Sequence, residues 1–130
     1  MLLFSPFPYT NLFYKCLIKI NRIPLIRHII NKTKHSLIKN IIIITGFKPQ
    51  NIKNELKDLK GIKFINNNKY QFTDMVHSSV LGLKKSKFDT LISYTDIIFT
   101  KKLFKIFYKK KYKNITIPYI KNWKDIWKKR

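Results

Sequence analysis

Asp96 is the residue in this sequence best placed to do chemistry. It comes two residues after the apolar run TLISY (Thr90–Tyr94), which reads as a buried strand. A carboxylate at the carboxyl end of such a strand can meet a Mg²⁺ ion that is bound to phosphate. An aspartate just after a strand is also a common turn former or helix cap. The position therefore has two interpretations, a cation ligand and a turn residue.

A second group of candidates lies at the end of the β-branched run NIIIITG (Asn40–Gly46). Thr45 and Gly46 close this run, and Lys48 follows it. Glycine lets a ligand approach the backbone closely, and lysine can neutralise phosphate. A tight turn with a solvated lysine explains the same residues, so the pattern leaves both interpretations open.

The segment TDMVHSS (Thr73–Ser79) has the features of a helix start. Thr73 and Asp74 can cap the helix, and Ser78 and Ser79 are small enough to pack close to a sheet. The three histidines of the chain are scattered, and no cysteine or carboxylate stands at ligand spacing from them, which argues against a zinc site.

The helices and strands that must position these candidates are predicted from apolar patterns, and the two kinds of pattern alternate along the chain. A continuous apolar run such as Asn40–Gly46 is typical of a strand in a parallel sheet that helices cover on both faces. Alternation with short connections predicts right-handed crossovers and a mostly parallel sheet. We therefore predict a single α/β domain over residues 1–130, a Rossmann-like three-layer sandwich that binds ligands beyond the carboxyl ends of its strands. The expected helices cover residues 24–30, 50–59, 73–83 and 101–108, and the expected strands cover residues 40–46, 62–65, 88–94 and 114–117.

The chain is strongly basic, with 28 Lys and Arg against 6 Asp and Glu and a formal net charge of +22. Such a balance favours an anionic ligand or partner. Lysine runs at residues 84–87, 101–105 and 109–113, with tyrosines and tryptophans nearby, are one way to build an RNA-binding surface. The same runs are typical of solvated helix ends in a gene rich in A and T.

Three features of the sequence bear on the cellular compartment of the protein. No run approaches the roughly 20 apolar residues that a membrane-spanning helix needs. The opening segment MLLFSPFPYT has no charged leader and carries two prolines. Cys16 is the single cysteine, which excludes an internal disulfide framework and is typical of a reducing compartment. We expect a cytoplasmic protein without a membrane span.

Five stretches of the chain, taken together, resemble the nucleotidyltransferases that include the phosphocholine cytidylyltransferases and the sugar-phosphate nucleotidyltransferases, of the broad MobA-like class. They occur in the order and at the spacing of that family, from about Thr10 to the last residue. The five stretches are YKCLIKINRIPLIRHII (Tyr14–Ile30), ITGF (Ile44–Phe47), NNKYQFTDMVHSS (Asn67–Ser79), SYTDII (Ser93–Ile98) and NWKDIWKKR (Asn122–Arg130).

The resemblance implies a partial nucleotide-diphospho-sugar transferase fold and a Mg²⁺-dependent reaction between a nucleoside triphosphate and a phosphorylated small molecule. It implies that Lys15 contacts phosphate and that Asp96 binds Mg²⁺. It also implies that Thr45 and Gly46 lie beside the base, with Thr73 and Asp74 in the nucleotide-binding segment. An acceptor phosphate would attack the α-phosphorus and release pyrophosphate. The alternative is a non-enzymatic subunit that binds RNA or protein through its basic surface.

The chain also departs from the family pattern. Leu2, Phe4 and Pro6 stand where the family has the glycines and the arginine of its phosphate loop, so we expect that cradle, and the central first strand before it, to be missing. Tyr14 replaces a proline, and Asp74 replaces an asparagine. Arg130 ends the sequence before the family's second metal-binding carboxylate. We therefore expect a domain that is incomplete at both ends, with its activity in doubt.

Overall fold

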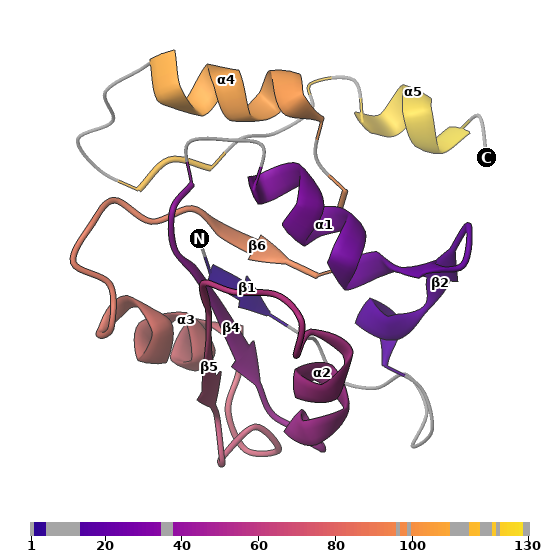
Figure 1. Ribbon diagram of the computed structural model, residues 1–130. Helices are drawn as coiled ribbons and strands as arrows, with labels where there is room; N and C mark the ends of the chain where they lie inside the picture. The colour runs from indigo at the N-terminus through magenta and orange to yellow at the C-terminus, as the bar shows by residue number, and fades with distance from the viewer. Residues whose placement is uncertain are drawn as a thin grey trace.

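A computed structural model describes residues 2–4, 14–34, 38–95, 97–98, 100–109, 115–117, 121 and 123–128 (Figure 1). Its strands are β1 (Leu2–Phe4), β2 (Lys19–Ile20), β3 (Ile23–Pro24), β4 (Ile41–Thr45), β5 (Ile62–Asn66) and β6 (Ile92–Tyr94). Its helices are the 3-10 helix η1 (Lys15–Leu17) and the α-helices α1 (Leu25–Lys34), α2 (Pro49–Glu55), α3 (Met75–Leu83), α4 (Lys101–Lys109) and α5 (Trp123–Lys128).

The main sheet has four strands in the order β5-β4-β1-β6, and every neighbouring pair is parallel. All five residues of β4 are buried, as the unbroken isoleucine run predicts for a strand that is covered on both faces. The prediction of an α/β fold with a parallel sheet is confirmed.

β1 corrects one of the sequence predictions. We expected the central first strand to be missing because the glycine-rich loop pattern that follows it in the family is absent. The structure instead places Leu2–Phe4 between β4 and β6, with Phe4 opposite both Ile44 and Tyr94. A short apolar segment forms a strand when partners are available on both sides, and the residues of the following loop do not decide this. No gap therefore opens between β4 and β6.

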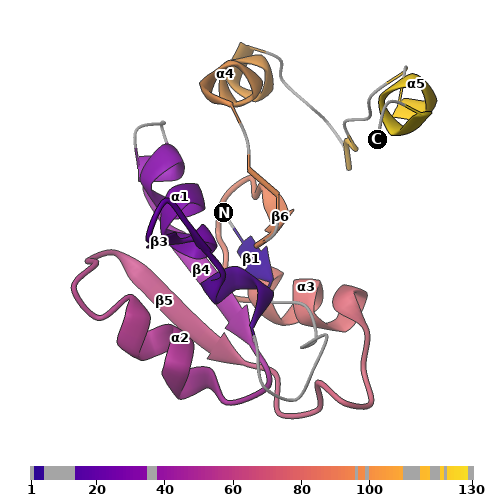
Figure 2. The ribbon, with the colours of Figure 1, turned by 90° about the vertical axis from the view of Figure 1, so that its right-hand side faces the viewer.

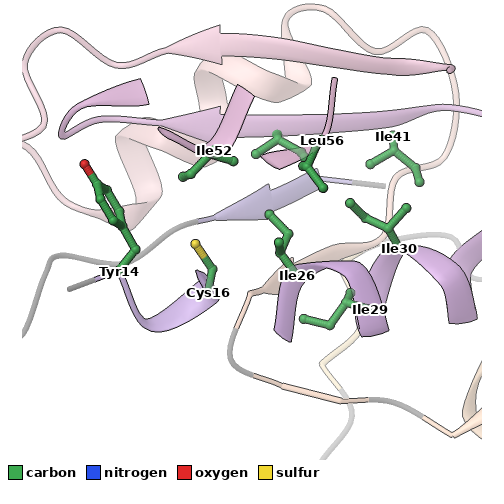
Figure 3. Close-up of a cluster of buried hydrophobic side chains, with 9 residues drawn as sticks. Tyr14, Cys16, Ile26, Ile29, Ile30, Ile41, Ile52 and Leu56 are labelled. Atoms are coloured by element: carbon green, nitrogen blue, oxygen red, sulfur yellow. The ribbon is translucent and has the colours of Figure 1, made fainter. Parts of the chain in front are cut away.

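Helices cover both faces of the sheet, which gives the three layers (Figure 2). On one face, side chains of α1 and of the α2 region pack against Ile41 and Ile43 of β4, together with Tyr14 and Cys16 (Figure 3). On the other face, Ile42 and Ile44 pack with Ile65 and Tyr94, and α3 contacts β4 and β1. Because successive strand residues point to opposite faces, the one isoleucine run supplies both cores.

α3 lies where the sequence predicts a helix. The face that packs against the sheet, however, is not the face that carries the apolar side chains. Val76 is 64% exposed and Val80 is 42% exposed, whereas Gly82 is buried and Ser78 and Ser79 are half-buried. These small residues recur at helical spacing, so they form one side of the helix. Small side chains let the helix axis approach the sheet closely, which explains why the serines and the glycine face inward.

Two predicted strands differ from the structure. The strand expected at 88–94 is shortened to β6, because Ser86 and Thr90 form a hydrogen-bonded loop with an Oγ–Oγ1 distance of 2.8 Å. Residues 115–117 form no strand, and Ile115 and Ile117 are 94% and 80% exposed. Their alternating pattern suits a strand, but no described strand pairs with them. Asn114, the first residue of that prediction, lies outside the described residues.

The β2–β3 hairpin carries backbone strain at Arg22. Ile20 pairs with Ile23, so Asn21 and Arg22 form a two-residue loop in which φ is 50° and 67°. Such loops favour asparagine followed by glycine, because a Cβ atom is disfavoured at positive φ. We predict that Arg22→Gly raises the free energy of unfolding by about 1 kcal/mol. Urea denaturation measures this change. Asn21→Gly is the control and should change stability less, because asparagine tolerates positive φ.

Candidate functional site

The strand order marks one position at the carboxyl edge of the sheet where a ligand is expected to bind. The chain passes from β1 to β4 and on to β5 in one direction, and then returns to place β6 on the other side of β1. The first two connections cover one face of the sheet, and the third, through α3, covers the other. In sheets of this type ligands bind at the carboxyl ends of the strands where the direction reverses. That point lies between β1 and β6.

Thr45 closes β4 and ties its end to the neighbouring strand β5. Its side chain is 1% exposed, and its hydroxyl lies 3.4 Å from the carbonyl of Ile65 and 3.3 Å from the side-chain oxygen of Asn66. The Thr45 carbonyl accepts a hydrogen bond from the backbone of Asn67 at 2.7 Å. Thr45 thus holds the tip of the sheet together, and its contact with a nucleotide stays a prediction.

Gly46 is required by a close approach of Tyr70. A Cβ atom built on Gly46 would lie 2.6 Å from the Cβ of Tyr70 and 2.7 Å from its Cγ. The space where a side chain at position 46 would stand therefore holds this tyrosine, and the contact of Gly46 with a nucleotide stays a prediction. Its ring forms an edge contact with Phe47, whose ring in turn lies 5.8 Å from that of Tyr14, centroid to centroid. Three segments that are distant in sequence thus converge beside the end of β4.

Tyr14 brings the segment of Lys15 to this edge. The Tyr14 hydroxyl donates a hydrogen bond to the Lys48 carbonyl at 3.2 Å. Burial raises the pKa of this phenol, and the nearby Cys16 and Tyr70 raise it further, so Tyr14 is a neutral donor at physiological pH. Lys48 has a left-handed backbone, with φ 32°, and its ammonium lies 5.1 Å from the centre of the Phe47 ring. Lys15 follows directly in η1 and is half-buried.

Asn67 organises the loop that carries Thr73 and Asp74. Its side chain is 3% exposed and donates to the hydroxyls of Thr73 at 2.9 Å and Ser78 at 3.1 Å. Its oxygen accepts from the Lys69 backbone at 3.0 Å. The sequence alone did not single out Asn67, although an asparagine directly after a strand is a recognised turn signal. The bonds fix the loop between β5 and α3 beside Gly46.

Asp74, and not Thr73, is the N-cap of α3. Its carboxylate accepts a hydrogen bond from the His77 backbone at 2.9 Å. The extended backbone of Asp74 suits this role, and a carboxylate is favourable at a helix N-terminus. The Thr73 hydroxyl instead donates to the Lys69 carbonyl at 2.8 Å. Both side chains thus have structural roles, and their contact with a nucleotide stays a prediction.

Two more acidic residues are used in the fold. The guanidinium of Arg27 in α1 donates to both carboxylate oxygens of Asp58, at 2.6 and 3.0 Å, and also pairs with Glu55 of α2. These bonds raise the pKa of Arg27 above its ordinary value, with Asp58 contributing more than Glu55. The network joins the two helices on one face of the sheet. Glu55 and Asp58 are therefore poor candidates for binding a metal.

The end of β6 carries Ser93 and Thr95. The Ser93 hydroxyl donates to the Tyr94 carbonyl at 2.8 Å, whereas the hydroxyl of the fully buried Thr95 has no hydrogen-bond partner among the residues that the structure describes. The next residue, Asp96, lies outside the described residues, so its predicted roles as a catalytic residue and a Mg²⁺ ligand stay predictions. Within the described ranges, no group of three or more His, Cys, Asp or Glu residues is arranged to hold a metal ion.

Comparisons with known proteins agree with this fold and with the resemblance read from the sequence. The chain is 28% identical over 122 residues to a CTP:phosphoglutamine cytidylyltransferase of Campylobacter jejuni, covering 89% of this chain and 48% of that protein. It superposes on a nucleotidyl transferase from a Methanothermobacter species with a TM-score of 0.63 and 13% identity, covering 73% of this chain and 49% of that one. No protein-family model matches the sequence.

The chain is thus nucleotidyltransferase-like in sequence and in fold, and it spans about half the length of the two relatives. Neither comparison favours the alternative of an RNA-binding subunit. No helix in the described part of the chain has the length and apolar character needed to cross a membrane.

Proposed function

We propose that this chain forms the nucleotide-binding part of a nucleotidyltransferase, which transfers a nucleoside monophosphate from a nucleoside triphosphate to a phosphorylated sugar or alcohol. The observation that carries the proposal is the carboxyl edge, where Ile44 of β4, Phe4 of β1 and Tyr94 of β6 pair in register and Asp96 follows Tyr94 by two residues in the sequence. The formal net charge of +22 suits an anionic substrate.

The proposed reaction needs charge stabilisation more than a covalent nucleophile. An acceptor phosphate oxygen attacks the α-phosphorus in line, a new P–O bond forms, and the bond to the leaving pyrophosphate breaks. Negative charge spreads over the phosphoryl oxygens in the transition state. Lys15 is proposed to contact these oxygens. Thr45 and Gly46 are proposed to lie beside the base, with Thr73 and Asp74 along the nucleotide.

The residue type that the sequence supplies two positions after β6 suits Mg²⁺. Magnesium ions are commonly held by one or two carboxylates together with substrate phosphates, so a single aspartate after β6 suits an ion that arrives with the nucleotide. When bound, the ion would neutralise charge on the phosphates. Asp96 is the residue we propose as its protein ligand.

The acceptor and the complete reaction are proposals for the whole protein, because the chain spans about half the length of its relatives. CTP and phosphoglutamine are named for the Campylobacter relative, and we extend only the substrate classes to this chain. A cytoplasmic location, where nucleoside triphosphates are abundant, is part of the same proposal.

Equilibrium binding tests the proposed function. The four common ribonucleoside triphosphates are titrated into the purified chain with Mg²⁺ and then with EDTA, and single-stranded RNA is titrated in parallel at low and high salt. We expect at least one triphosphate to bind in a Mg²⁺-dependent way. Binding of RNA alone, with a steep salt dependence, would contradict the proposal and support the basic RNA-binding alternative.

A further inference from the structure

Thr95 stands out among the buried polar side chains. Thr33, Thr45 and Ser93 are buried threonine and serine residues whose hydroxyls all have partners; that of Thr33, for example, donates to the Ile29 carbonyl at 2.8 Å. The Thr95 residue is 0% exposed, and its hydroxyl is the buried side-chain polar atom of the described residues that lacks a partner. Leaving such a group unpaired in the interior destabilises the folded state. A valine of nearly the same shape would avoid that cost.

The position of Thr95 suggests what the hydroxyl is for. Thr95 is the first residue after β6, beside the point where the strand order reverses. Tyr94 pairs with Phe4 at the end of β1, so Thr95 follows the last paired residue of the strand. Because Thr95 lies beyond the paired residues, a change of its side-chain χ1 angle leaves the pairing of β1 with β6 intact, and such a change would turn its hydroxyl toward a ligand at the carboxyl edge.

We propose that the Thr95 hydroxyl donates a hydrogen bond to a phosphate oxygen of the nucleotide bound at this edge. The inference rests on the proposed function, and it adds a binding residue next to Asp96. A hydroxyl is a good donor to anionic oxygen, and such charge-assisted bonds are shorter and stronger than neutral ones. The hydroxyl that is unpaired in the free protein would gain its partner from the nucleotide.

The test compares nucleotide affinity and thermal stability in Thr95→Val. Valine keeps the shape of threonine and removes the donor. Because a hydrogen bond to a charged group contributes about 1.5–3 kcal/mol, we expect the Kd for the Mg²⁺-bound triphosphate to rise about 10-fold or more. The melting temperature of the free protein should stay the same or rise. Thr95→Ser, which keeps a hydroxyl, should bind within a few-fold of the wild type.

Thr33→Val is the matched control, because it removes a buried and bonded hydroxyl in α1. We expect it to lower the melting temperature and leave the Kd unchanged. If Thr95→Val does not fold, Thr95→Ala and Thr95→Ser supply the same comparison, and the alanine variant should bind more weakly. Wild-type affinity in the valine or alanine variant would overturn this inference alone. A wild-type chain that binds no Mg²⁺-bound triphosphate would overturn the proposed function as well.

Discussion

Asp96→Asn is expected to weaken Mg²⁺-dependent binding of the nucleoside triphosphate about 100-fold. Asparagine keeps the size of the side chain and removes its negative charge, which is what a hard divalent cation binds. A 100-fold change corresponds to about 2.7 kcal/mol of binding free energy. Isothermal titration calorimetry with each triphosphate, in Mg²⁺ and in EDTA, measures the effect. In EDTA the variant and the wild type should bind with similar, weak affinity.

Asp89→Asn is the matched control for this prediction. Asp89 is exposed in the loop before β6, and the substitution makes the same change of charge. We expect it to bind the triphosphate as the wild type does. If both variants lose affinity equally, the effect comes from the overall charge of the chain. If neither does, Asp96 is a turn residue, the other interpretation that its position in the sequence allows.

Gly46→Ala is expected to destabilise the fold by about 2–3 kcal/mol, the upper part of the range of about 1–3 kcal/mol found when a well-packed site is overfilled. The new methyl group would lie 2.6 Å from the Cβ of Tyr70, so the tyrosine backbone has to shift and not only its ring. That shift would loosen the loop that Asn67 fixes and would weaken nucleotide binding. Urea denaturation measures the loss of stability, and calorimetry measures the loss of affinity.

A double-mutant cycle separates this contact from other effects of Gly46→Ala. Tyr70→Gly removes the Cβ that the new methyl group meets, so the alanine should cost much less in that background. Gly61→Ala is a useful contrast, because Gly61 has a φ of 80° and open space around it. Its cost should come from backbone strain and should not depend on Tyr70. Equal costs for Gly46→Ala in both backgrounds would contradict the packing explanation.

Much of the fold follows from local patterns in the sequence. The isoleucine run of β4 is buried on both faces because no polar residue interrupts it, and that pattern alone predicts a covered parallel strand. The helix expected at 50–59 forms as α2 (Pro49–Glu55), which begins one residue earlier and ends four residues earlier than predicted. Both elements depend on a few neighbouring residues, so the sequence is enough to place them, although it does not fix where the helix ends.

Other features depend on contacts that a single sequence does not reveal. β1 exists because two strands flank it, and its three residues carry too little pattern to be recognised alone. Asn67 and Tyr70 matter because of what they touch across the tip of the sheet. The unpaired hydroxyl of Thr95 likewise becomes visible only when its surroundings are known. The sheet edge that carries the candidate residues could therefore be predicted from the sequence, whereas the contacts among its side chains could not, and nucleotide binding there stays a prediction.

The central claim is that the nucleotide binds at the carboxyl edge beside β1 and β6, and backbone hydrogen exchange tests it most directly. Exchange is measured in the wild-type chain with Mg²⁺, with and without a saturating nucleoside triphosphate. We expect slower exchange at residues 93–98 and 45–48 when the triphosphate is bound, with little change at the amino ends of the strands. Protection confined to the amino ends, or around the exposed lysines Lys63 and Lys85, would contradict it.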